Sequence, residues 1–261
     1  MKIDAINFKL QELLDEFLTS IKDNVFPFPS DSEVNTVQRA IYNGYIAGGC
    51  FASMMLREEP SDYDFYFNTE ADADIFKQFA LTYLKDRIVF ESPNALTFDN
   101  KFQFMLKHYG NPNAMVNSFD FEHLKIYKCY NSPINLYRVN GNIYKILLEK
   151  HLLYSGSKYP LASLMRVRKY IKRGWFIPAS QMLSIVFDIM AMYNILDENP
   201  DAEYNKDTLK LKRRNMEIDV DTLVEQMMGI DPLTIMAELS AVTGQRISFD
   251  EVINLINKEK P

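Results

Sequence analysis

The chain has 261 residues, of which 47% are apolar and 25% are charged, the proportions of an ordinary folded protein. These values exclude a disordered or collagen-like chain, and we expect no membrane partner because no apolar run reaches the roughly 18 residues of a membrane span. The net charge of −6 excludes a basic surface over the whole chain, although a local basic patch is compatible with it. Two cysteines cannot build a disulfide framework, which fits a reducing, cytoplasmic setting.

The first part of the chain is predicted to begin with two helices. Apolar residues at helical spacing predict helices over 4–22 and 31–43, separated by two prolines within 26–30. Either Asp31 or Ser32 is the expected N-cap of the second helix, since both side chains can accept a backbone hydrogen bond.

Strands and helices then alternate up to about residue 135. The apolar run 45–49 predicts a short strand that ends in a glycine pair, and acids alternate with aromatic residues over 61–67, the period of a strand. The other predicted elements of this part are a helix over 50–57, a helix over 70–86, strands over 87–91 and 95–98, a return strand over 102–106, a short helix within 111–118 and a strand-like segment over 118–130.

From about residue 140 the pattern is helical. The predicted helices cover 141–154, 160–173, 178–196, 219–228, 231–243 and 248–258. We therefore predict two domains, one over 1–135 that contains the strands and a helical one over 136–261, which together make an α+β protein.

A glycine pair is the first candidate for a binding role. Gly48 and Gly49 stand between a predicted strand and a predicted helix, where the backbone can approach a bound group closely. The free N–H groups at the start of the helix favour a phosphate. A tight turn without any ligand is the plain alternative.

A pair of aspartates is the second candidate. Asp62 and Asp64 are two residues apart on a predicted strand, so their carboxylates point to the same side with Cα atoms about 6.6–6.8 Å apart. A divalent cation between them relieves their repulsion, and Mg²⁺ prefers a few carboxylates together with waters and substrate phosphates. A half-buried strand with solvated acids is the plain alternative.

Asp120 is the third candidate, because it lies between two phenylalanines in the strand-like segment. If that segment pairs beside the strand of Asp62 and Asp64, three carboxylates meet. Three carboxylates can hold two metal ions about 3.5–4 Å apart, the arrangement for in-line attack at phosphorus.

These features resemble the signature of the DNA polymerase β-like nucleotidyltransferase superfamily. The resemblance covers about residues 40–130: an apolar strand with a glycine pair, a short helix, Asp62-x-Asp64 on the next strand, and Asp120 at the position of the third acid. The pattern is most similar to phage-encoded nucleotidyltransferase-like proteins, for which the host cytoplasm is the expected location. It departs from the tRNA CCA-adding branch, where Arg-Asp follows the glycine pair and this chain has Phe51-Ala52-Ser53.

The resemblance implies a small mixed sheet flanked by helices and a specific set of site residues. It implies that Asp62, Asp64 and Asp120 are catalytic and ligate Mg²⁺ or Mn²⁺. Gly48, Gly49, Cys50 and Ser53 would hold the NTP phosphates. The implied reaction transfers an NMP from an NTP to an acceptor hydroxyl and releases pyrophosphate.

A basic segment lies in the helical half. Nine basic residues and one acid lie between 138 and 175, a net charge of +8. Helical spacing places Arg166, Lys169 and Arg173 on one face, which we expect to bind the NTP triphosphate or an RNA acceptor. Tyr170 and Trp175 are candidates for stacking on a base. A solvated helix with both rings in the core is the alternative.

Three functions are compatible with these features. The first is a Mg²⁺-dependent nucleotidyltransferase whose acceptor is RNA, with tRNA as an example. The second is the same transfer to a small molecule or a protein. The third is a nucleotidyltransferase-like fold that serves as a non-catalytic binding or structural component of a phage.

Overall fold

The computed structural model describes residues 3–23, 29–131, 137–138 and 142–192, together with residues 233, 236, 248–250 and 252–253. The predicted helices over 219–228 and 231–243, and most of the one over 248–258, lie outside the described residues. The chain divides into two compact units, Met1–Ser155 and Gly156–Pro261. This division comes later in the chain than the predicted boundary after residue 135. No helix in the described part of the chain is both long and apolar enough to cross a membrane.

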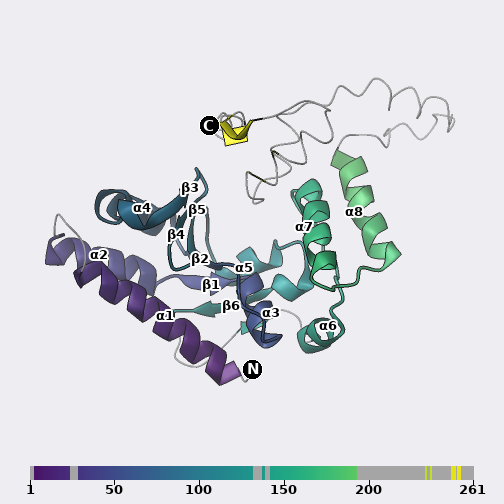
Figure 1. The fold of residues 1–261 in the computed structure, drawn as a ribbon, viewed down its shortest axis with the longest axis horizontal. Helices are drawn as coiled ribbons and strands as arrows, with labels where there is room; N and C mark the ends of the chain where they lie inside the picture. The colour runs from purple at the N-terminus through teal and green to yellow at the C-terminus, as the bar shows by residue number, and fades with distance from the viewer. Residues whose placement is uncertain are drawn as a thin grey trace. The chain divides into compact units, whose positions relative to one another are not determined.

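The first unit contains a seven-stranded mixed sheet in the order β3-β4-β5-β2-β1-β6-β7 (Figure 1). The pairing of β2 with β5 is parallel, and the other pairings are antiparallel. The strands are β1 (Tyr45–Ala47), β2 (Tyr63–Phe67), β3 (Ile88–Glu91), β4 (Ala95–Phe98), β5 (Phe102–Tyr109), β6 (Ile126–Cys129) and β7 (Tyr137–Arg138).

Helices accompany the sheet in the first unit. They are α1 (Ile3–Asp23), α2 (Asp31–Tyr42), α3 (Gly49–Met55), α4 (Glu70–Tyr83), α5 (Pro112–Asn117) and α6 (Ile143–Glu149), with 3-10 turns η1 (Lys85–Arg87) and η2 (Glu122–Leu124). The second unit contains α7 (Pro160–Lys172) and α8 (Ala179–Met192). The structure confirms the predicted α+β class, with a sheet flanked by helices and helices after it.

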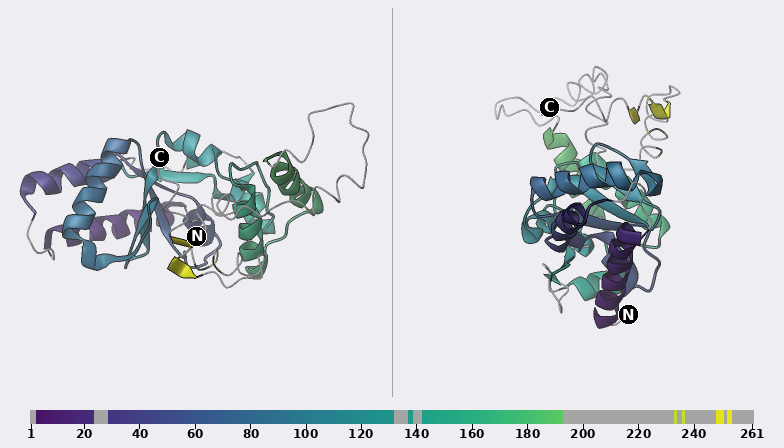
Figure 2. Two further views of the ribbon diagram at one scale, coloured as in Figure 1. Left: turned by 90° about the horizontal axis from the view of Figure 1, so that it is seen from above. Right: turned by 90° about the vertical axis from the view of Figure 1, so that its left-hand side faces the viewer.

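The two faces of the sheet are covered differently. Helices α1, α2 and α4 lie on one face (Figure 1 and Figure 2), where buried aromatic rings form the core. Phe104 of β5 lies at the centre of these rings, with centroids 4.1 Å from Phe76 and 5.2 Å from Phe17. On the other face, a smaller cluster around Tyr45 and Tyr66 packs with Val116 of α5.

Three local predictions differ from the structure. The N-cap of α2 is Ser30, because its hydroxyl accepts from the Glu33 N–H at 3.3 Å while the Glu33 carboxylate accepts from the Ser30 N–H at 2.8 Å. The predicted helix 141–154 ends as α6 at Glu149, since Lys150 adopts a left-handed conformation with φ 48°. The third difference concerns the segment over 118–130, which is not one strand: a loop and η2 precede β6.

Candidate functional site

The glycine pair and the aspartate pair lie next to each other at one end of two neighbouring strands. Asp62 immediately precedes β2, and Asp64 of β2 is the partner of Ala47, the last residue of β1. Gly48 follows Ala47 directly, and its N–H donates to the carbonyl of Ile126 on β6 at 3.0 Å. The antiparallel register of β1 and β2 therefore brings the two predicted motifs together.

Gly48 lies next to a carboxylate and an aromatic ring. A Cβ atom at this position would lie 3.5 Å from Oδ2 of Asp64 and 3.9 Å from Cε2 of Phe119. The φ of Gly48 is +96°, a conformation that side-chain-bearing residues rarely adopt. The backbone conformation thus favours glycine here, whereas a Cβ would make only ordinary contacts with Asp64 and Phe119.

The electrostatics of Cys50 show that both aspartates are close to the glycine turn. Cys50 is buried in the first turn of α3, and burial raises the pKa of its thiol well above the usual value. The negative charges of Asp64 and then Asp62 raise this pKa further. A thiol held protonated in this way is a poor nucleophile, so any role of Cys50 at the site belongs to its backbone.

Asp62 and Asp64 are suited to a divalent cation. Both residues are only partly exposed, and Asp62 accepts a hydrogen bond from the Ser61 hydroxyl at 3.1 Å. Two carboxylates that are two residues apart, beside a glycine, could provide part of an oxygen coordination shell and leave the rest to water and phosphate.

Asp120 lies in a loop, at a position where a strand-like segment was predicted. It is 4% exposed and stands between α5 and η2, and β6 pairs with β1 rather than with β2. The pairing beside the Asp62 and Asp64 strand, on which the meeting of three carboxylates was made conditional, does not occur, because β1 separates β2 from β6. Within the described residues, no three His, Cys, Asp or Glu side chains form a group that could hold a metal ion.

The segment around Asp120 nevertheless borders the glycine pair. The ring of Phe119 lies beside Gly48, and a Cβ on Gly49 would lie 3.7 Å from Cδ2 of Leu124. Residues 153–155 fix this segment: the Ser155 N–H donates to the Asp120 carbonyl at 2.9 Å, and the Glu122 N–H donates to the Leu153 carbonyl at 3.0 Å.

Gln103 is a neighbour of the aspartates that the sequence reasoning missed. It is the partner of Asp64 in the parallel pairing of β2 and β5, so the two residues are adjacent across the sheet. Its side-chain amide donates to Thr97 of β4 at 3.1 Å. No local pattern indicates this neighbour, because the chain between β2 and β5 passes through α4, β3 and β4 before it returns.

The other predicted phosphate ligands are found in two places. Ser53 is buried in α3, where its carbonyl accepts from the Glu58 N–H at 2.8 Å. Arg166, Lys169 and Arg173 lie along α7 and its C-terminal cap in the second unit, with Lys169 exposed and the two arginines partly exposed.

The two aromatic candidates of the second unit contact each other. Trp175 is 4% exposed, and its ring centroid lies 5.6 Å from that of Tyr170 in an edge-on arrangement. This burial agrees with the alternative in which Trp175 belongs to the core, and it leaves little of the ring for stacking on a base.

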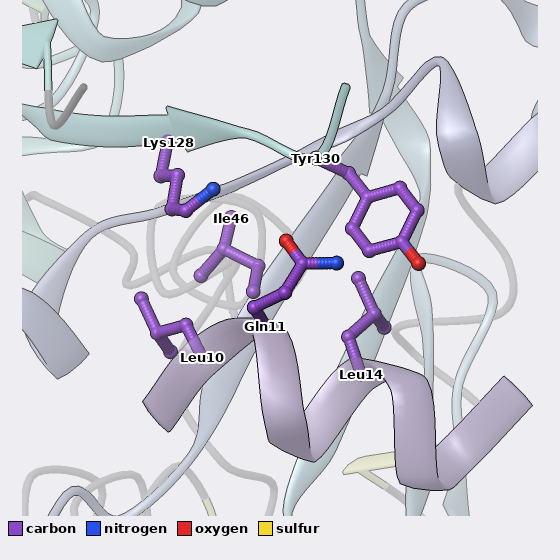
Figure 3. Close-up of a pocket in the computed structure, with 6 residues that line it drawn as sticks. All are labelled: Leu10, Gln11, Leu14, Ile46, Lys128 and Tyr130. Carbon is purple, nitrogen blue, oxygen red and sulfur yellow. The ribbon is translucent and has the colours of Figure 1, made fainter. Parts of the chain in front are cut away.

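A small cavity lies on the face of the sheet that α1 covers. Its lining residues include Leu10 and Gln11 of α1, Ile46 of β1 and Lys128 of β6 (Figure 3). Burial lowers the pKa of the Lys128 amine. Ile46 lies between Tyr45 and Ala47 in β1 and points to the face opposite theirs, so this cavity is separate from the aspartate pair.

Comparisons with known proteins give one family match and several structural similarities. The family described as "Gabija anti-defense 2 family protein" matches residues 8–135, slightly less than half of the chain. No curated protein sequence matches.

The similar solved structures are tRNA-related enzymes. A Thermotoga maritima CCA-adding enzyme complexed with tRNA is 12% identical, with a TM-score of 0.43, over 85% of this chain and 52% of that one. A tRNA-processing enzyme with CTP is 14% identical, with a TM-score of 0.44, over 84% of this chain and 57% of that one. This chain thus spans little more than half the length of either enzyme.

Proposed function

We propose that the chain is a metal-dependent nucleotidyltransferase that moves an NMP from an NTP to an acceptor hydroxyl. The observation that carries this proposal is the position of the Asp64 carboxylate next to Gly48, where its Oδ2 atom lies 3.5 Å from a Cβ placed on the glycine. Asp62 lies two residues away, on the same side of the strand and close enough to Cys50 to raise its pKa.

In the proposed reaction, Asp62 and Asp64 would hold a divalent cation such as Mg²⁺, which would neutralise charge on the triphosphate. Gly48 allows the phosphates to approach the carboxylates. The acceptor oxygen forms a bond to the α-phosphorus while the bond from this phosphorus to the bridging oxygen breaks, and pyrophosphate leaves with the electron pair. The hydroxyl proton passes to a carboxylate oxygen or to water. The protein contributes position and electrostatics, and no covalent intermediate is needed.

Transfer of label tests this proposal. The full chain is incubated with NTPs labelled at the α-phosphate, Mg²⁺, total RNA and a protein extract, and the labelled product is classified by its sensitivity to nuclease and protease. We expect transfer by the natural chain and none by Asp62→Asn or Asp64→Asn. Asp86→Asn is the matched control, because Asp86 is an exposed carboxylate in η1. Transfer that persists in both site variants contradicts the proposal.

We propose RNA as the acceptor class because of the basic face of α7. Lys169 is exposed and Arg166 and Arg173 are partly exposed on one side of this helix, which suits contact with backbone phosphates. Replacing all three by alanine should weaken RNA binding and flatten its dependence on salt. If the label appears on protein or in a small molecule instead, the transferase proposal stands and the RNA proposal falls.

The family match favours a specific biological role, which is to counter the Gabija defence. We propose that nucleotidyl transfer is the means of this action. Cells that carry the Gabija defence are infected while they express either the natural chain or Asp64→Asn. If only the natural chain restores infection, the chemistry is required for the role. If both chains restore it, the role depends on binding, as in the non-catalytic alternative.

A further inference from the structure

Phe119 is an aromatic residue at the proposed site, and the proposed reaction assigns it no role. Its Cε2 atom and an Asp64 carboxylate oxygen both lie next to Gly48, at 3.9 Å and 3.5 Å from a Cβ placed there. A ligand bound beside Gly48 would therefore meet the negative oxygen of Asp64 on one side and an apolar ring on the other. Inorganic phosphate gains nothing from the ring, whereas a nucleotide has both a charged and an apolar part.

The backbone of Phe119 is fixed from two directions. Its N–H donates to the Val116 carbonyl at 3.2 Å, and its carbonyl accepts from the Ser155 hydroxyl at 3.1 Å. Its side chain is only partly buried, although it packs against the cluster that contains Tyr66, with ring centroids 6.0 Å apart. The ring is thus held in one place before any ligand arrives, which reduces the entropy cost of contact.

We propose that Phe119 is the residue that contacts the nucleoside part of the NTP, and that it makes the site select a nucleotide over a bare polyphosphate. The inference rests on the proposed function, because it assumes that the triphosphate binds at Asp62 and Asp64. Contact between an aromatic side chain and a base contributes to affinity for every base, since each base has a π-face. The residue therefore favours nucleotides as a class without choosing among them.

Binding of two ligands tests this inference without relying on turnover. Calorimetry with the full chain and Mg²⁺ measures the affinity for an ATP analogue with a methylene between the α- and β-phosphates, and separately for inorganic tripolyphosphate. We expect Phe119→Ala to weaken binding of the analogue about tenfold and to leave tripolyphosphate binding unchanged. Phe119→Tyr should retain the natural affinity for both. Phe8→Ala is the matched control, because Phe8 is a phenylalanine of α1 that is 69% exposed.

Each outcome decides between distinct explanations. Equal weakening of both ligands by Phe119→Ala, or unchanged binding of both, overturns the role of Phe119 while the transferase proposal stands. Failure of the natural chain to bind either ligand overturns both. Urea unfolding of each variant shows whether a loss of affinity reflects a loss of folded protein, and Phe119→Tyr keeps the test valid if the alanine variant is unstable.

Discussion

The two faces of the central sheet differ in what they contribute, and β2 shows the difference residue by residue. Tyr63, Phe65 and Phe67 alternate with Asp64 and Tyr66, so consecutive side chains point to opposite faces. Phe65 and Phe67 enter the aromatic core around Phe104, with ring centroids 5.0 and 6.2 Å away. The Asp64 carboxylate lies next to Gly48 instead.

This alternation separates stability from chemistry within one strand. The face with α1, α2 and α4 buries large rings, and burial of such rings dominates the free energy of folding. The face with Gly48 carries two carboxylates, whose charge favours contact with water or with a cation. Substitutions one residue apart should therefore have different consequences, which the following predictions examine in order of expected size.

The largest effect is expected at Asp64. Asp64→Asn keeps the size of the side chain and removes the charge that would hold the cation, so nucleotidyl transfer should fall at least about 10³-fold. The urea midpoint should change little, because Asp64 is outside the aromatic core. Parallel measurement of transfer and of unfolding checks this prediction. Asp120→Asn serves as the comparison: an equally large loss would show that Asp120 acts with the pair, although the described residues contain no group of three His, Cys, Asp or Glu side chains that could hold a metal ion.

A second effect of similar size is expected in stability rather than in chemistry. Phe104 is fully buried among the rings on the covered face, so Phe104→Ala should lower the free energy of unfolding by about 3–5 kcal/mol. Transfer per folded molecule should be retained at low temperature. Chemical denaturation gives the first quantity, and activity normalised to the folded fraction gives the second. A loss of transfer larger than the loss of folded protein would show that the two faces are coupled.

Local patterns predicted most of the helices and strands, because these elements depend on residues that are neighbours in the sequence. The acid–aromatic alternation of 61–67 predicted β2, and the turn after residue 98 predicted the antiparallel pairing of β4 with β5. The resemblance to the nucleotidyltransferase signature implied that Gly48 and Asp64 are close, and the antiparallel register of β1 and β2 shows it. The predictions of β2 and of the β4–β5 pairing needed no knowledge of distant contacts.

Distant contacts explain what the sequence did not predict. The alternation of Phe119, Asp120 and Phe121 resembles a strand, but Phe121 forms only a single bridge with Tyr154, and η2 follows at once. The position of Asp120 is thus decided by residues more than thirty positions later. The parallel register that puts Gln103 beside Asp64 is decided in the same way, by a crossover through α4 and a hairpin.

A third and smaller effect is expected from a change at Gln103. Gln103→Glu places a carboxylate on the strand next to Asp64, at the register partner of that residue. A third acid should raise the affinity for Mn²⁺ about tenfold, since hard cations bind more tightly as carboxylate ligands are added. Calorimetry with Mn²⁺ measures the change, and Gln103→Ala is the control that removes the amide without adding charge. Equal affinities in Gln103→Glu and the natural chain would place the side chain of residue 103 outside the cation site.

The smallest effect concerns pH and the residue between the two aspartates. Burial raises the pKa of Tyr63 to about 12, and the negative charge of Glu59 adds to this effect. Because the pKa in the folded state exceeds the ordinary value near 10, the stabilisation is fully present below pH 10 and is lost as the pH rises toward 12. Urea midpoints of the natural chain should therefore fall over this interval more steeply than those of Tyr63→Phe, which keeps the ring and removes the titrating hydroxyl. If the urea midpoints of the two chains fall in parallel as the pH rises, Tyr63 is as accessible to water as the partly exposed aspartates on either side of it. The contrast between the two faces of the sheet would then not hold at the start of β2.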